Sequence, residues 1–189
     1  MFYLYGMVLG AILGLLFGGK LSNALNFKID KSLFIIASFI LQVSGRILGL
    51  KGYGFALRYG VAILIISYVL LFIGIWFNRR YMGLWLVGTG AALNALVTMA
   101  NNGKMPVSRA AAIKANVPGM LALIEKGMDI KHSIIDAGTV LPILADIIYV
   151  PKWLVGYGAE VASIGDLVVL VGISLLVFTI VKRSKSQAL

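Results

Sequence analysis

The stretch Asn101-Asn102-Gly103-Lys104-Met105-Pro106-Val107-Ser108 ends a long apolar segment with amides, a glycine and a proline. Glycine and proline are the strongest interrupters of regular structure, and asparagine is common at helix ends. The chain is therefore apolar before residue 101, half-polar through an insertion at residues 101–163, and apolar again after it. This division predicts a membrane protein that carries a structured polar region.

The composition supports a lipid environment. Hydrophobic residues make up 60% of the 189 residues and charged residues only 13%, and the mean hydropathy is +0.98. A soluble domain of this size cannot bury so much apolar surface, so we expect lipid to surround most side chains.

Five segments have the length that a bilayer requires. A hydrocarbon core of about 30 Å is crossed by about 20 apolar residues of helix. The segments of that kind are residues 2–19, 33–50, 59–77, 82–100 and 164–181. The sequence predicts an all-α, polytopic bundle of about five transmembrane helices, forming a single membrane domain over residues 1–189.

The insertion is expected to stay at one membrane face. Residues 108–128 suggest an interfacial helical stretch broken near Pro118-Gly119. Residues 133–149 are too polar and too short for an ordinary span, so they predict a re-entrant or interfacial helix. A sixth crossing at residues 134–150 is the alternative, and it would place the C-terminus outside.

Basic residues predict the orientation, because short loops rich in Lys and Arg stay in the cytoplasm. With five spans, one side holds Lys20, Lys28, Lys31, Arg79, Arg80, Lys182, Arg183 and Lys185. The C-terminus is then cytoplasmic, and the insertion lies on the outer side. The net charge of +10 predicts membrane lipids as partners and, because the basic residues are dispersed, no nucleic acid.

Small residues suggest close helix packing. Gly6, Gly10 and Gly14 recur on one face of the first segment, and such faces let helix backbones approach closely in lipid. Contact within one bundle is the first interpretation. A homo-oligomer formed through this face is the second, and a partner membrane subunit is also possible.

Polar side chains follow the fourth segment toward the insertion. Asn94 and Thr98 lie four residues apart, and Asn101 lies near the end of the same stripe, followed by Asn102 and Lys104. The stripe predicts either a hydrogen-bonded seam between helices or the lining of a site for a polar headgroup or small solute.

Two acids are the candidates for chemistry. Ser163-Ile164-Gly165-Asp166 has the form of a capping box, in which Ser163 and Asp166 close the start of the last helix. Alternatively, Asp146 and Asp166 meet outside the membrane helices as a carboxylate pair that shares a proton, activates water or binds a cation. We treat both as candidate catalytic residues.

The chain resembles a family of small bacterial multi-pass membrane proteins catalogued as a domain of unknown function. Three features carry this resemblance: the pattern at residues 101–108, Asp146, and Ser163-Ile164-Gly165-Asp166. That resemblance covers most of the chain, implies the bacterial plasma membrane and brings no activity.

Residues 84–180 are more faintly similar to lipoprotein signal peptidases, which are intramembrane aspartyl enzymes with the motifs Gly-Asn-Leu-Ile-Asp-Arg and Phe-Asn-x-Ala-Asp. Here Thr98 stands where the first catalytic aspartate is expected, Ser163 where the asparagine is, and only Asp166 is kept. The peptidase dyad then requires Asp146 as a substitute.

Three function classes remain. In the first, the chain binds a polar headgroup or small solute at the outer face, with a possible role as an accessory subunit. The ligand-binding residues would then be Asn94, Thr98, Asn101, Asn102, Lys104 and Ser163. In the second the chain transports an ion or solute, and in the third it is an aspartyl peptidase. We expect no cofactor and no metal, because the chain has one histidine and no cysteine.

Overall fold

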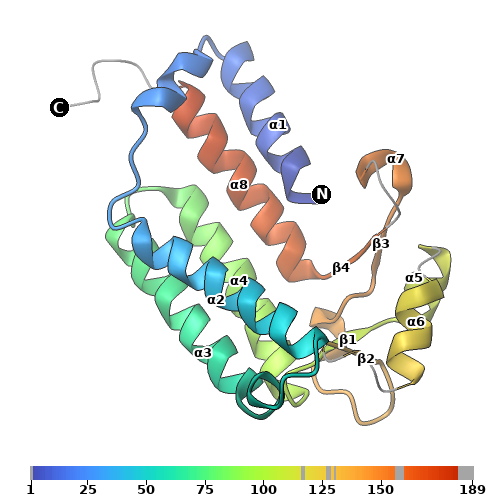
Figure 1. The fold of residues 1–189 in the computed structure, drawn as a ribbon. Helices are drawn as coiled ribbons and strands as arrows, with labels where there is room; N and C mark the ends of the chain where they lie inside the picture. The colour runs from blue at the N-terminus through green and yellow to red at the C-terminus, as the bar shows by residue number, and fades with distance from the viewer. Residues whose placement is uncertain (1, 116–117, 127–128, 130, 156–159, 183–189) are drawn as a thin grey trace.

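The computed structural model describes residues 2–115, 118–126, 129, 131–155 and 160–182. Arg183 and Lys185, which entered the orientation argument, lie outside the described residues. Within these ranges the chain is mostly helical, as predicted. The long helices are α1 (Phe2–Leu16), α2 (Leu33–Leu50), α3 (Gly54–Phe77), α4 (Met82–Ala100) and α8 (Ile164–Lys182) (Figure 1).

The helices begin and end where the backbone requires it. Helix α1 ends at Leu16, because Gly18 follows with a φ of 81°, which a helix cannot accommodate. Helix α3 begins at Gly54, before the apolar segment at residues 59–77. Helices α3 (from Arg58), α4 and α8 are long and apolar enough to cross a membrane.

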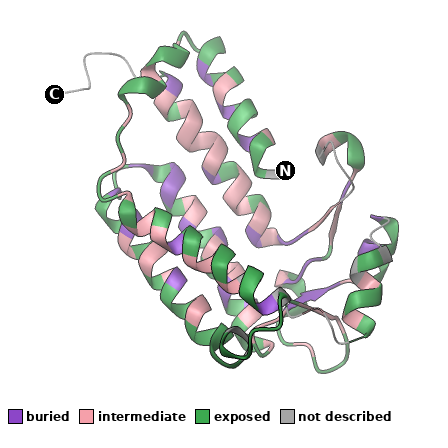
Figure 2. Cartoon of the chain, in the orientation of Figure 1, coloured by how far each residue is buried: buried purple, intermediate pink, exposed green. Residues whose placement is uncertain are grey.

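Helix α8 lies at the centre of the helical part. It packs against α1 on one side and α4 on the other, and the hairpin of α2 and α3 joins α4 through α3 (Figure 1). The faces that point away from these contacts carry many exposed Leu, Ile, Val and Phe side chains (Figure 2). This is the inverse of a soluble bundle, which buries its large apolar side chains and exposes polar ones.

Glycines allow α8 to approach both neighbours. A Cβ atom on Gly14 would lie 2.6 Å from the Cβ of Val181, and one on Gly10 would collide with the Ser174 carbonyl. On the other side of α8, a Cβ on Gly83 would lie 2.6 Å from the Gly172 carbonyl oxygen. The glycine face of α1 therefore serves contact within the chain, the first of the two interpretations above.

The insertion contains short strands as well as short helices. Its elements are β1 (Met105–Val107), α5 (Arg109–Lys114), α6 (Pro118–Glu125), β2 (His132–Ile134), η2 (Pro142–Leu144), β3 (Ile148–Val150), α7 (Lys152–Val155) and β4 (Glu160–Ala162). Strands β1 and β2 pair in parallel, with Met105 opposite His132, and β3 and β4 pair antiparallel, with Ile148 opposite Ala162. A further bridge joins Val107 to Asp146.

The predicted re-entrant or interfacial helix at residues 133–149 is wrong, and so is its alternative of a sixth helical crossing there. This segment forms β2, the 3-10 turn η2 and most of β3. Leu141 has a φ of 54° and precedes Pro142, and both features interrupt an α-helix. The run Ile148-Tyr149-Val150 favours a strand, so the segment pairs with other parts of the insertion instead.

The glycine contacts generate a prediction about stability. Gly10→Ala places a methyl group against the Ser174 carbonyl, so α1 and α8 must separate. We expect the free energy of unfolding to fall by about 1–3 kcal/mol. Gly60→Ala is the matched control, because no atom lies within 4 Å of its Cβ position and alanine is the better helix former. Thermal unfolding in detergent, followed by circular dichroism, tests this. An unchanged midpoint for Gly10→Ala would contradict the packing.

Candidate functional site

Asp166 closes the first turn of α8 together with Ser163. The Asp166 backbone N–H donates to Ser163 Oγ at 2.9 Å, and the Ser163 backbone N–H donates to Asp166 Oδ2 at 3.0 Å. This reciprocal pair is a capping box, and it places a carboxylate at the positive end of the helix dipole. The capping function inferred from the sequence is therefore present.

The same carboxylate also links three helices. Tyr3 in α1 donates its hydroxyl to Asp166 Oδ1 at 2.6 Å, and Asn94 Nδ2 in α4 donates to the same oxygen at 2.9 Å. The Ser163 hydroxyl donates to Asn94 Oδ1 at 2.8 Å. We call Tyr3, Asn94, Ser163 and Asp166 the Asp166 cluster. Hydrogen bonds to a charged group are about twice as strong as neutral ones, so the cluster ties α1 and α4 to the start of α8.

The cluster depends on the close approach of α4 and α8. A Cβ on Gly165 would collide with the side-chain oxygen of Asn94, and one on Gly90 would collide with the Gly165 carbonyl. Any larger residue at these two positions would move the helices apart. Asn94 could then no longer reach both Ser163 and Asp166.

Asp146 lies in the insertion beside this cluster. Its backbone N–H donates to the Pro106 carbonyl at 2.9 Å, and its carbonyl accepts from the Ser108 N–H at 2.9 Å. These bonds hold the residue against β1, where it is only 8% exposed. Among the residues that the structure describes, none donates a hydrogen bond or an ion pair to the Asp146 carboxyl group.

The surroundings of Asp146 favour its protonated form. Burial, and secondly the negative charge of Asp166, raise the pKa of Asp146 to about 7, and Lys131 opposes the rise. Two nearby carboxylates cannot both ionise without a cost in energy. The two acids therefore differ: Asp166 has donors on both oxygens, whereas the side chain of Asp146 has none among the described residues.

The remaining predicted residues hold the insertion rather than join the Asp166 cluster. Asn101 donates to the Val97 and Val140 carbonyls at 2.7 and 2.9 Å and accepts from the Val140 N–H at 3.0 Å. Thr98 contacts the sulfur of Met105 at 3.6 Å. Asn102 has a φ of 56° in the turn after α4, and Lys104 Nζ donates to the Asp129 carbonyl at 3.0 Å.

A third acid of the described chain, Asp129, is paired with His132. Asp129 Oδ2 lies 2.9 Å from His132 Nδ1, and its Oδ1 accepts from the backbone N–H groups of Lys131 and His132. Burial alone would raise the pKa of Asp129, but these hydrogen bonds and His132 lower it below its usual value. Across the described ranges, no three His, Cys, Asp or Glu side chains are grouped as a metal site would require.

Sequence reasoning missed Tyr3, which gives Asp166 its shortest hydrogen bond. Tyr3 lies 163 positions before Asp166, and a tyrosine at the end of an apolar segment is equally typical of a membrane interface. No local pattern indicates which helix it faces. Only the packing of α1 on α8 brings the hydroxyl to the carboxylate.

Comparison with known proteins identifies a family but no activity. A family model described as "Family of unknown function (DUF5317)" matches residues 26–178. A protein of Thermotoga maritima, described as an uncharacterized protein, is 28% identical over 170 residues, which cover 89% of this chain and 86% of that protein. No solved structure matches the chain.

The Asp166 cluster predicts that Asn94 is important for stability. Asn94→Ala removes one donor to Asp166 and the acceptor of the Ser163 hydroxyl. We expect the free energy of unfolding to fall by about 1.5–3 kcal/mol, the range for hydrogen bonds to charged groups. Thr98→Val, one turn away on α4, loses only a weak contact to sulfur and should cost less than about 1 kcal/mol. Equal losses in chemical unfolding of the two variants would argue against the cluster.

Asp146 predicts a pH dependence of stability. Its pKa in the folded protein is about 7, against an ordinary value of 3.8, so folding favours the protonated form. The associated stability is complete below pH 4 and is lost as the pH rises through 7, on the order of 4 kcal/mol in all. Asp146→Asn should flatten thermal unfolding midpoints between pH 4 and 8. Asp129 contributes a pH dependence only below this window. Its pKa is lowered in the folded protein, so the stability that it contributes is lost only as the pH falls into the acid range. A slope that persists in Asp146→Asn would refute this assignment.

Proposed function

This chain belongs to DUF5317, a family of unknown function, and we propose that it is a multi-pass membrane protein with a binding site at its outer face. The ligand is the ammonium group of a lipid headgroup or of a small solute. The carboxyl group of Asp146 carries this proposal: the residue is only 8% exposed, and a cation beside it would offset the burial and the repulsion from Asp166 that raise its pKa.

The membrane part of the proposal rests on the helices. Three of them are long and apolar enough to span, and their outward faces expose large apolar side chains. Helices α1 and α2 are apolar too and complete five spans. The lysines that flank η1 (Leu21–Asn26) and the arginines of the turn between α3 and α4 then lie in the cytoplasm of a bacterial cell. The C-terminus is cytoplasmic and the insertion is outside.

The ligand class follows from the two acids. Asp166 supplies a fixed negative charge, because Tyr3, Asn94 and Ser163 hold it in place. Asp146 supplies a carboxyl group with free hydrogen-bonding capacity. An ammonium group carries a positive charge and several N–H donors, so it satisfies both features at once. A neutral or anionic ligand would not relieve the repulsion between the two carboxylates.

Binding explains these contacts better than proteolysis does. An aspartyl peptidase needs two carboxyl groups that share a proton and face one water molecule. Here the oxygens of Asp166 already accept three hydrogen bonds from protein donors. A carboxylate held in this way is suited to fixing helices and charge. A role as an accessory subunit, which binds without reacting, fits this arrangement.

The test compares headgroups that differ in the ammonium N–H donors. The protein is placed in nanodiscs of phosphatidylethanolamine or phosphatidylcholine at pH 8, where Asp146 is ionised, and thermal unfolding is measured. We expect greater stability with phosphatidylethanolamine, by about 1.5–3 kcal/mol. Free ethanolamine added to phosphatidylcholine discs distinguishes a lipid headgroup from a small solute as the source of the ammonium group. It stabilises the protein only if a soluble amine is enough for binding.

Two variants control this experiment. Asp146→Asn should abolish the preference for ethanolamine. Asp136→Asn should keep it, because Asp136 is exposed and its Oδ1 only accepts bonds within its own turn, which an asparagine oxygen also does. If neither amine stabilises the unmodified protein at pH 8, the proposed site does not bind ammonium groups.

A further inference from the structure

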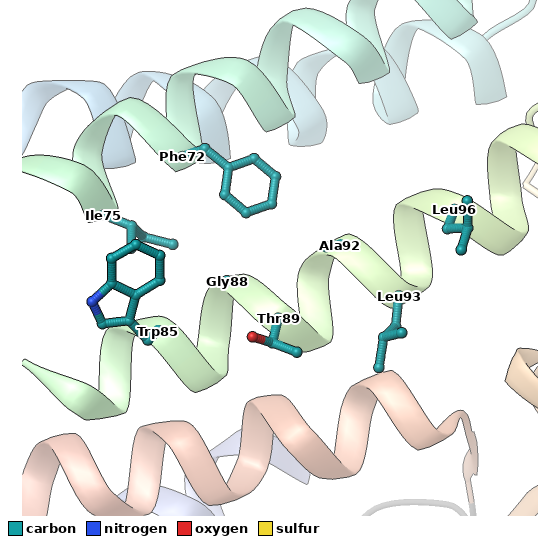
Figure 3. Close-up of a pocket in the computed structure, with 8 residues that line it drawn as sticks. All are labelled: Phe72, Ile75, Trp85, Gly88, Thr89, Ala92, Leu93 and Leu96. Atoms are coloured by element: carbon teal, nitrogen blue, oxygen red, sulfur yellow. The ribbon is translucent and has the colours of Figure 1, made fainter. Parts of the chain in front are cut away.

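An apolar hollow lies along α4 on its side toward α3. Its volume is about 420 Å³, and Gly88, Ala92 and Leu96 of α4 with Phe72 and Ile75 of α3 line it (Figure 3). The hollow exists because Gly88 brings α4 close to α3: a Cβ there would lie 2.9 Å from Ile75 Cδ1. Ala92, on the same face of α4, has too small a side chain to fill the space beyond.

A tryptophan lines one end of the hollow. Trp85 lines this end (Figure 3), and its ring packs edge-on against Trp76, with the centroids 6.5 Å apart. Both rings remain exposed, Trp76 by 57% and Trp85 by 41%. Paired and exposed tryptophans are typical of the level at which lipid headgroups meet acyl chains.

A basic residue lies directly beside these rings. The Arg79 guanidinium is 5.4 Å from the centroid of the Trp76 ring, and the Arg79 carbonyl accepts from Trp85 Nε1 at 2.9 Å. No carboxylate pairs with Arg79 among the described residues, whereas the neighbouring Arg80 pairs with Asp30 at 3.2 Å. Arg79 therefore has its donors available for an anion.

The turn that carries Arg79 is held in place. Asn78 is fully buried; it donates to the Asp30 and Gly74 carbonyls at 2.7 and 2.8 Å and accepts from the Asp30 N–H at 2.8 Å. These bonds tie the start of the α2 region to the end of α3. Because the turn is tied down, the backbone of Arg79 is fixed beside Trp85, which lines the end of the hollow.

We propose that this hollow binds one acyl chain of an anionic phospholipid from the cytoplasmic leaflet, with its phosphate at Arg79. The apolar walls match the acyl chain, Trp76 and Trp85 lie at the interface, and the unpaired guanidinium complements the anionic headgroup. The inference rests on the membrane part of the proposed function and is independent of the ammonium site at Asp146, which lies at the opposite end of α4.

Fluorescence quenching by brominated lipids tests the inference in the full chain. The chain has three tryptophans, and the third, Trp153, is 80% exposed in α7. In a Trp153→Phe background, the fluorescence reports on Trp76 and Trp85 alone. The protein is reconstituted in phosphatidylcholine vesicles that contain either dibrominated phosphatidylglycerol or dibrominated phosphatidylcholine at the same mole fraction.

We expect phosphatidylglycerol to bind about fivefold more tightly than phosphatidylcholine, the ratio typical of one basic residue at an anionic surface. Arg79→Gln should bring the ratio close to one. Arg58→Gln is the matched control: Arg58 lies near the other end of α3 and is stacked on an aromatic ring in the same way, 5.6 Å from the centroid of Tyr59. It should keep the fivefold ratio. Ala92→Phe, which fills the hollow, should lower quenching by both lipids.

Each other outcome overturns a definite claim. Equal quenching by the two lipids, or a ratio that Arg79→Gln does not change, overturns the anionic-lipid site while leaving the membrane protein intact. If the preference for phosphatidylglycerol is found but Ala92→Phe does not lower quenching by either lipid, the hollow is not the acyl-chain site. If neither brominated lipid quenches, the helices do not lie in lipid, and the membrane part of the proposed function fails with this inference.

Discussion

The structure depends on the close approach of α8 to α1 and α4. Glycine lines both contacts, at Gly10 and Gly14 toward α1 and at Gly83 and Gly90 toward α4, and a side chain at these positions would collide with backbone or side-chain atoms. In the lipid environment that we propose, helices gain little from excluding water. Association then depends on van der Waals contact and on hydrogen bonds between helices. The glycines supply the first and permit the second.

The Asp166 cluster illustrates this dependence. A carboxylate at the N-terminus of α8 is stabilised by its own capping box, and this much is local. Its bonds to Tyr3 and Asn94 exist only because both neighbouring helices lie against α8. One acid thus closes a helix and joins three. The cost of holding a charge near an apolar region is offset by hydrogen bonds on both of its oxygens.

The insertion is positioned by the end of α4. Asn101 binds Val140, Lys104 directly precedes β1, and Val107 of β1 forms a bridge with Asp146. Asn101 and Lys104, which the sequence suggests as ligand-binding residues, therefore hold in this structure the part of the insertion that contains Asp146. The two proposed sites lie at opposite ends of the helical part: Asp146 in the insertion with Asp166 at the start of α8, and an arginine with two tryptophans at the turn between α3 and α4.

The sequence by itself determined the helical class, the break after Ala100 and the capping box at Ser163 and Asp166, because these depend on composition, on turn residues and on contacts within three positions. It misled at residues 133–149, where a strand pairing with distant residues replaced the expected helix. Tertiary structure alone decided that Tyr3 meets Asp166, that Gly10 faces α8 and that Asp146 is buried against β1. The physical reason is distance along the chain: local propensities act over a few residues, whereas these contacts join positions that only the packing of helices brings together.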